Sequence, residues 1–188
     1  ESGAIFGFDL IYGLPGDTLE GFSASIDFAL RLYPNHLDIF PLSVLPGTAL
    51  AMGAGTLGLD YLKVPPYTLQ SSPGFPAGAM RDAAGLAVAC DIFYSRGKAV
   101  AWFNSLLTPL GLSPSSFLRE FHLWLRETKG EELSEAALSD QDIWQAQRAF
   151  ITRLYPGKRL RKLLPAALDQ IDYHWHYAAA LSTPPPEL

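Results

Sequence analysis

Cysteine is almost absent from this sequence, because Cys90 is the single one among 188 residues. One cysteine cannot form a disulfide within the chain, and this usage is typical of a cytoplasmic protein. Cys90 lies in an apolar run of helical character. That setting favours a small core residue, with a redox or ligand role as the alternative.

Long apolar runs and an excess of positive charge are also missing. No stretch approaches the roughly 20 apolar residues that a membrane helix requires, and the start lacks the pattern of a signal peptide. The net charge of −5 argues against broad nucleic-acid binding. One basic cluster, at residues 158–162 with Arg153 before it, predicts a solvated helix face or, alternatively, a phosphate-binding patch.

What the chain does have is the composition of a globular protein, with 48% apolar and 18% charged residues. It has no initiating methionine and begins almost at once in an apparent interior strand. We therefore expect a piece of a longer chain, the alternative being a mature chain after processing.

The first forty residues predict a strand, a helix and a second strand. Residues 4–12 form an apolar run, typical of a strand buried on both faces of a parallel sheet. Gly and Pro at 13–16 end this run, and Asp17 lies three residues before Glu20, which is capping-box spacing. A helix over 18–33 and a strand over 36–42 then complete a parallel βαβ crossover.

Asp9 is the exception within the first strand. A buried carboxylate is costly unless it is bound, so Asp9 is expected either to pair within the core or to point at a ligand.

From residue 77 onward the pattern is helical almost throughout. The expected helices span about 79–96, 98–108, 114–129, 139–155 and 158–180. We expect three parts, namely an α/β part over 1–67, a helical domain over 68–182 and a flexible tail over 183–188.

Residues 9–18, which read DLIYGLPGDT, and residues 37–48, which read LDIFPLSVLPGT, resemble the late barrel strands of radical S-adenosylmethionine (SAM) enzymes. The closest likeness is to the oxygen-independent coproporphyrinogen oxidase type and to cobalamin-binding Fe-S oxidoreductases. The resemblance covers residues 4–67, roughly a third of the chain. It implies an α/β fold, a partial (incomplete) radical SAM-type barrel, followed by a mostly α-helical C-terminal region.

The same resemblance implies cofactors. The parent enzyme would use SAM and a [4Fe-4S] cluster, with cobalamin in one class, as an oxidoreductase or a methyltransferase. Such a cluster needs three cysteines in a C-x3-C-x2-C loop, which this chain cannot supply. The implied partner is therefore the missing N-terminal barrel and cluster region, and the fragment alone would be inactive.

By residue matching, the resemblance implies three cofactor-binding positions and no catalytic or metal-binding residue. Asp9 would hydrogen-bond the ribose hydroxyls of SAM, Ile11 would pack against adenine, and Ser43 would lie where backbone groups read the adenine edge. His174 and His176 suggest a metal pair, but residues two apart on a helix point about 200° from one another. They are expected to belong to an aromatic packing seam.

Two functions of different class follow. In the first, the chain is the C-terminal part of a radical SAM enzyme, contributing part of the SAM site and a substrate-side helical cap for an unidentified small molecule. Its open strand edge would then favour self-association. In the second, the chain is a non-catalytic helical binding module with a small α/β appendage, which the missing cysteines fit.

Overall fold

The computed structural model describes residues 5–130 and 138–182. Its backbone divides into two compact units, Glu1–Val88 and Ala89–Leu188. Helix α3 (Ala77–Cys90) begins in the first unit, so the change from strands to helices comes before the division. The sequence-based division after residue 67 stays a prediction, and the expected tail at 183–188 lies outside the described residues.

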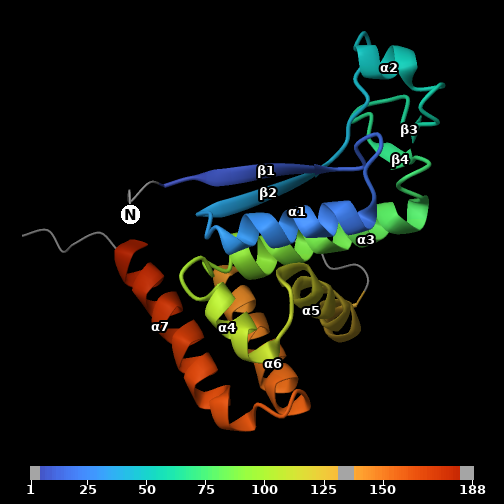
Figure 1. The fold of residues 1–188 in the computed structure, drawn as a ribbon. Coiled ribbons are helices and arrows are strands. Elements are labelled where there is room, and N and C mark those ends of the chain that lie inside the picture. Colours follow the sequence, from blue (N-terminus) through green and yellow to red (C-terminus); the bar gives the residue numbers. More distant parts are fainter. Residues whose placement is uncertain (1–4, 131–137, 183–188) are drawn as a thin grey trace, which may run out of the picture. The chain divides into compact units, whose positions relative to one another are not determined.

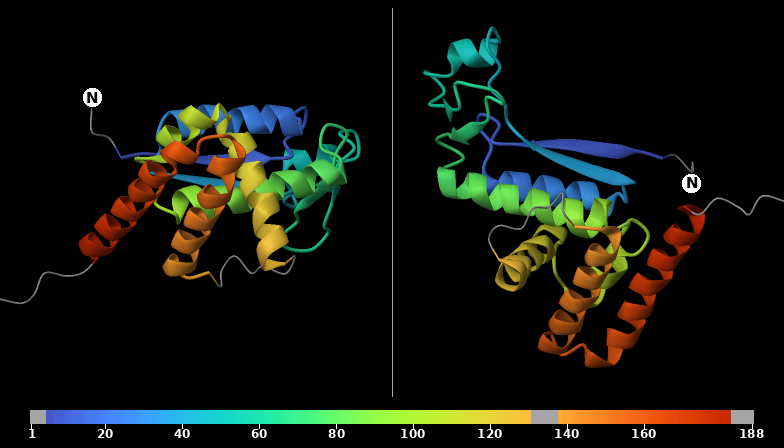
Figure 2. Two further views of the ribbon diagram at one scale, coloured as in Figure 1. Left: turned by 90° about the horizontal axis from the view of Figure 1, so that it is seen from below. Right: turned by 180° about the vertical axis from the view of Figure 1, so that it is seen from behind.

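A two-stranded parallel sheet opens the first unit. Strands β1 (Gly7–Tyr12) and β2 (His36–Pro41) pair in parallel, and helix α1 (Leu19–Arg31) connects them. Figures 1 and 2 show α1 and α3 side by side on one face of this sheet. The predicted parallel βαβ crossover is therefore confirmed.

Exposure alternates along both strands, so the sheet has one covered and one open face. Tyr12 and Leu37 are buried on the covered face, where the ring of Tyr12 lies 5.5 Å from that of Phe22 in α1. The expectation of a strand buried on both faces is wrong, because helices cover only one side of the described sheet. As a consequence, Asp9 lies at the surface and not in a core.

The turn between β1 and α1 is built on glycine. Gly13 and Gly16 have φ of 88° and 83°, a backbone region that favours residues without a Cβ. The helix then begins one residue later than the capping-box spacing predicts. Thr18 is the N-cap, its Oγ1 accepting from the Gly21 N–H at 3.2 Å, while Asp17 accepts from the Thr18 N–H.

Beyond β2 the chain makes a small extension of the first unit. It contains helix α2 (Ala49–Gly53) and the antiparallel strands β3 (Asp60–Tyr61) and β4 (Leu69–Ser71). A bridge between Ser43 and Thr68 joins the end of β2 to this extension.

The second unit is helical. After α3 come a π-helix η1 (Asp91–Ser95), α4 (Phe103–Leu110), α5 (Pro114–Lys129), α6 (Asp140–Gly157), a 3-10 turn η3 (Arg161–Leu163) and α7 (Leu164–Ser182). Its core is aromatic, with Phe93 packed edge-on against Phe117 and Phe121. Ser113 caps α5 with Pro114 at its first position, and Ser139 caps α6.

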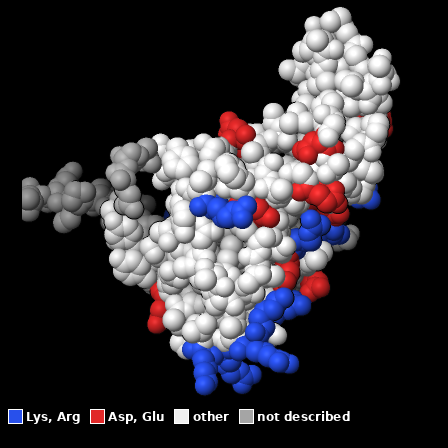
Figure 3. Space-filling model, viewed as in Figure 1, with Lys and Arg blue, Asp and Glu red and all other residues white. Residues whose placement is uncertain are grey.

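Lys and Arg side chains gather at one end of the helical unit, near the turn between α6 and α7 (Figure 3). This is where the basic cluster at 158–162 lies. Lys158 pairs with Glu120, whereas Arg159, Arg161 and Lys162 are exposed and make no ion pair with any other described residue. The cluster is therefore exposed to solvent, and its alternative interpretation as a phosphate-binding patch stays a prediction.

Over residues 5–130 and 138–182 the fold is mostly helical, with two small two-stranded sheets and no closed barrel. No helix in these ranges is long and apolar enough to cross a membrane.

Candidate functional site

The open face of the β1–β2 sheet brings a pair of carboxylates next to a pair of apolar side chains. Asp9 and Ile11 lie two residues apart in β1, so both side chains point to this face. The strand register places Asp38 beside Asp9 and Phe40 beside Ile11. Ile11 is 43% exposed and Phe40 51% exposed, a large apolar surface to leave in contact with water.

The two carboxylates on the open face make it electrostatically unfavourable as it stands. Like charges directly opposite one another on neighbouring strands are destabilising. His36 lies with its Nε2 4.0 Å from the Asp38 carboxylate and can pair with it when protonated. The Asp9 carboxylate hydrogen-bonds no other described residue, so its oxygens can accept hydrogen bonds from a ligand.

Ser43 follows β2 at the carboxyl end of the parallel strands. Its bridge to Thr68 is made by its neighbours, because the Val44 N–H donates to Tyr67 and the Leu42 carbonyl accepts from Leu69. The N–H and C=O of Ser43 itself therefore point away from this bridge, and neither bonds another described residue. A ligand could therefore form hydrogen bonds with the N–H and C=O of Ser43, without any contribution from its side chain.

The groups around the open face are of the kinds that bind a nucleoside, whereas the chain lacks the ligands of an iron-sulfur cluster. A carboxylate acceptor, an apolar patch and unused peptide groups match the hydroxyls, ring face and ring edge of a nucleoside. The [4Fe-4S] cluster does not fit, because it needs three cysteine ligands and Cys90 is the single cysteine of the sequence. Across the part of the chain that the structure describes, no three His, Cys, Asp or Glu side chains are grouped to hold a metal ion.

One of the two histidines of α7, His176, belongs to an aromatic seam. Trp144 of α6 stacks on Trp175 of α7 with ring centroids 4.8 Å apart, and the His176 ring lies 5.0 Å from that of Trp175. Desolvation by burial lowers the pKa of His174. These contacts give His176 a packing role, while the His174 ring lies 5.1 Å from that of its chain neighbour Tyr173.

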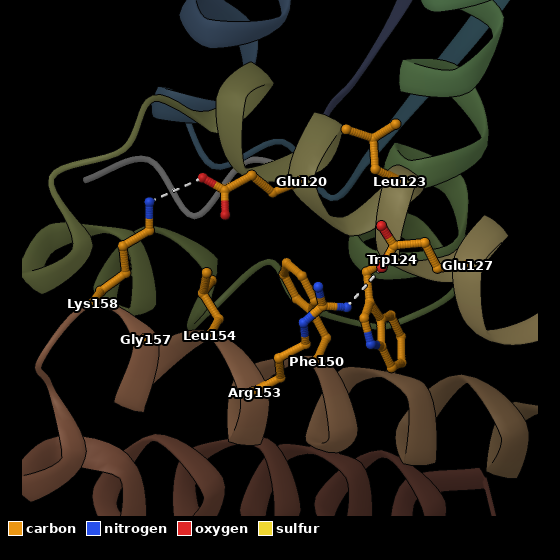
Figure 4. A pocket seen from close by; sticks show the side chains of 9 residues that line it. All are labelled: Glu120, Leu123, Trp124, Glu127, Phe150, Arg153, Leu154, Gly157 and Lys158. Atoms are coloured by element: carbon orange, nitrogen blue, oxygen red, sulfur yellow. Dashed lines mark hydrogen bonds and ion pairs between the residues drawn. The ribbon is translucent and has the colours of Figure 1, made fainter.

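A second candidate site lies in the helical unit, in a groove between α5 and α6 of about 400 Å³ (Figure 4). Its floor is apolar and is formed by Trp124, Phe150 and Leu154, all nearly buried. Two ion pairs join α5 to α6 at the edges of the groove. Lys158 Nζ lies 3.2 Å from the Glu120 carboxylate, and Arg153 Nη1 lies 2.9 Å from that of Glu127. The groove offers an apolar surface between two mixed-charge edges.

Sequence reasoning missed part of both sites. Asp38 and Phe40 join the open face through the register between strands, which no local pattern reveals. The α5–α6 groove has a weak sequence signal, since Glu120, Leu123, Trp124 and Glu127 follow the 3–4–7 spacing of one helix face.

Comparisons with protein-family models, with curated proteins and with solved structures find no match to this chain.

Proposed function

We propose that this chain contributes part of the SAM site of a radical SAM enzyme, with β1 and β2 as two strands of an incomplete α/β barrel and the helical unit as a cap region. The observation that carries the proposal is the free carboxylate of Asp9 beside Ile11 on an open sheet face. The DLIYGLPGDT motif leads from that face through a glycine turn to a capped helix.

Each residue has a distinct part in holding SAM. The Asp9 carboxylate accepts hydrogen bonds from the two ribose hydroxyls, and charge-assisted bonds of this kind are the strong ones. Ile11, with Phe40 beside it, covers the face of the adenine ring, while the N–H and C=O of Ser43 pair with the ring edge. When bound, SAM supplies the group-transfer or oxidising chemistry of such an enzyme.

The open face also supports a partner. Two strands alone are marginally stable in water, and β1–β2 leaves both outer edges without a strand partner among the described residues. The missing barrel and cluster region, with its three cysteines, would pair with these edges and cover the open face. When that region is absent, we expect a second copy of the chain to cover the open face.

The proposal is tested by SAM binding to this chain, measured by calorimetry. Asp9→Ala should weaken binding by about tenfold or more, because it removes hydrogen bonds to a charged group. Asp60→Ala is the matched control, since Asp60 is another exposed strand aspartate of the same unit. Equal affinities of wild type and Asp9→Ala, or no saturable binding of SAM, would overturn the proposal.

The α5–α6 groove favours a second candidate function, a non-catalytic helical module that binds a small amphiphilic ligand. Exposed ion pairs contribute only about 0–1 kcal/mol each, so a ligand can displace the pairs at the groove edges at little cost. The test uses anilinonaphthalene sulfonate as a fluorescent amphiphile. Leu123→Asp in the groove should abolish saturable binding, whereas Leu163→Asp, at another exposed leucine, should not. Equal effects of the two changes would exclude this function.

A further inference from the structure

A separate pocket lies at the carboxyl ends of β1 and β2, on the helix-covered side of the sheet. Its volume is about 310 Å³, and its lining includes Tyr12 and Pro41, the last residues of the two strands. Tyr12 alternates with Asp9 and Ile11 along β1, so this strand-end pocket and the open face are on opposite sides of the sheet. Ligands of open α/β sheets bind outside the carboxyl ends of the strands.

The strand-end pocket has an apolar floor. Leu69 of β4 and Met80 of α3 are nearly buried beneath it. Ala77, Arg81 and Ala84 line it as well, and their spacing with Met80 places all four on one face of α3. The volume is at the lower end of the range for small-molecule sites.

Arg81 is the charged residue of this lining. It hydrogen-bonds no other described residue and forms no ion pair with one. Its guanidinium folds back along α3, with Nη2 3.9 Å from the position that a Cβ on Gly78 would occupy. The first turn of α3 contains no acidic residue to compensate this charge. A concave surface with an apolar floor and with Thr68 and Gln70 in its lining thus carries one unpaired cation.

We propose that the strand-end pocket binds a small organic monocarboxylate, with its carboxylate on Arg81 and its apolar body on Leu69 and Met80. The planar guanidinium fork matches a carboxylate bidentately. One uncompensated cation balances one negative charge, whereas a phosphate dianion would bring more charge than this lining offers. The site is independent of the SAM proposal, because it uses neither Asp9 nor the open face.

The test is a titration of the isotope-labelled chain followed by amide chemical shifts. The probes are benzoate and hexanoate, compared with uncharged benzamide and with inorganic phosphate. Benzoate or hexanoate should shift amides around Arg81 saturably, and Arg81→Gln should weaken binding by about tenfold or more. Arg119→Gln, which removes another exposed arginine without a partner among the described residues, should leave the affinity unchanged.

A second variant tests the apolar half of the strand-end pocket with the charge intact. Ala84→Phe places a ring in the cavity and should abolish carboxylate binding. Amide shifts away from the pocket should remain those of the folded wild-type chain. The proposal is overturned if neither carboxylate binds, if phosphate or benzamide binds as well as benzoate, or if Arg81→Gln and Arg119→Gln behave alike. Loss of SAM binding in Asp9→Ala has no bearing on these outcomes.

Discussion

The buried amide of Gln147 should be a large single contributor to the stability of the helical unit. Gln147 on α6 is 1% exposed, and its Nε2 donates to the carbonyl oxygens of Phe93, at 2.9 Å, and Gly97, at 3.0 Å. Phe93 belongs to the π-helix η1, so this side chain ties an irregular turn to a regular helix. Gln147→Leu keeps a similar volume but removes both bonds.

The expected cost follows from those two bonds. Each contributes about 0.5–1.5 kcal/mol, and leaving the buried carbonyls without a donor adds about 1–3 kcal/mol, so we expect a loss of about 2–6 kcal/mol. All four tryptophans, at positions 102, 124, 144 and 175, belong to the second unit. Urea unfolding followed by tryptophan fluorescence therefore measures this unit, and the midpoint should fall by about 1–3 M.

The control for this prediction is on the same helix. Gln145 is exposed, so Gln145→Leu should change the free energy of unfolding by less than about 0.5 kcal/mol. If Gln147→Leu were as mild as Gln145→Leu, the two hydrogen bonds would not anchor the π-helix and the reasoning would be refuted.

Two further predictions concern α6 and its contacts. Burial raises the pKa of Tyr155 to about 12, and its hydroxyl donates to the Leu106 carbonyl at 3.0 Å. Tyrosine in the unfolded chain ionises near pH 10, so the free energy of unfolding should fall as the pH rises from about 10 to 12. Between urea unfolding near pH 9 and near pH 11, the fall should be smaller in Tyr155→Phe than in the wild type by on the order of 1 kcal/mol. Equal falls in the two proteins would contradict this prediction. Asp172 accepts from the Trp144 indole N–H at 2.9 Å and from Arg148. Asp172→Ala should cost about 1–3 kcal/mol, measured by the same fluorescence assay, and a loss below about 0.5 kcal/mol would contradict the role of these bonds.

Features that depend on neighbours in sequence were predictable. Ser113 with Pro114, and Ser139 with Asp142, specify helix starts through bonds that span three residues, and both starts are where the sequence places them. The parallel βαβ crossover also follows from local patterns, since a strand, a capped helix and a strand in that order leave little choice.

Features that depend on distant contacts were not predictable. The sequence favours one long helix over 79–96, but the chain changes to a π-helix at Asp91, where Gln147 bonds it from more than fifty residues away. The next helix begins at Phe103 and not near 98, because Lys98 has a positive φ of 54°. The apolar run around β1 suggested a buried Asp9, whereas exposure depends on what covers the sheet.

The candidate site divides in the same way. Asp9, Ile11 and Ser43 were named from the motif, and their roles stay predictions. The partners that complete the open face, Asp38 and Phe40, required the strand register. The unpaired guanidinium of the strand-end pocket required the three-dimensional arrangement of the first unit.

The central claim is that the open face of β1–β2 forms part of a SAM site. Its most direct test is a map of amide and side-chain shifts of this chain on addition of millimolar SAM. The account predicts saturable shifts at Asp9, Ile11 and Ser43, absent in Asp9→Ala. Shifts confined to the α5–α6 groove, or none at the three residues, would contradict it.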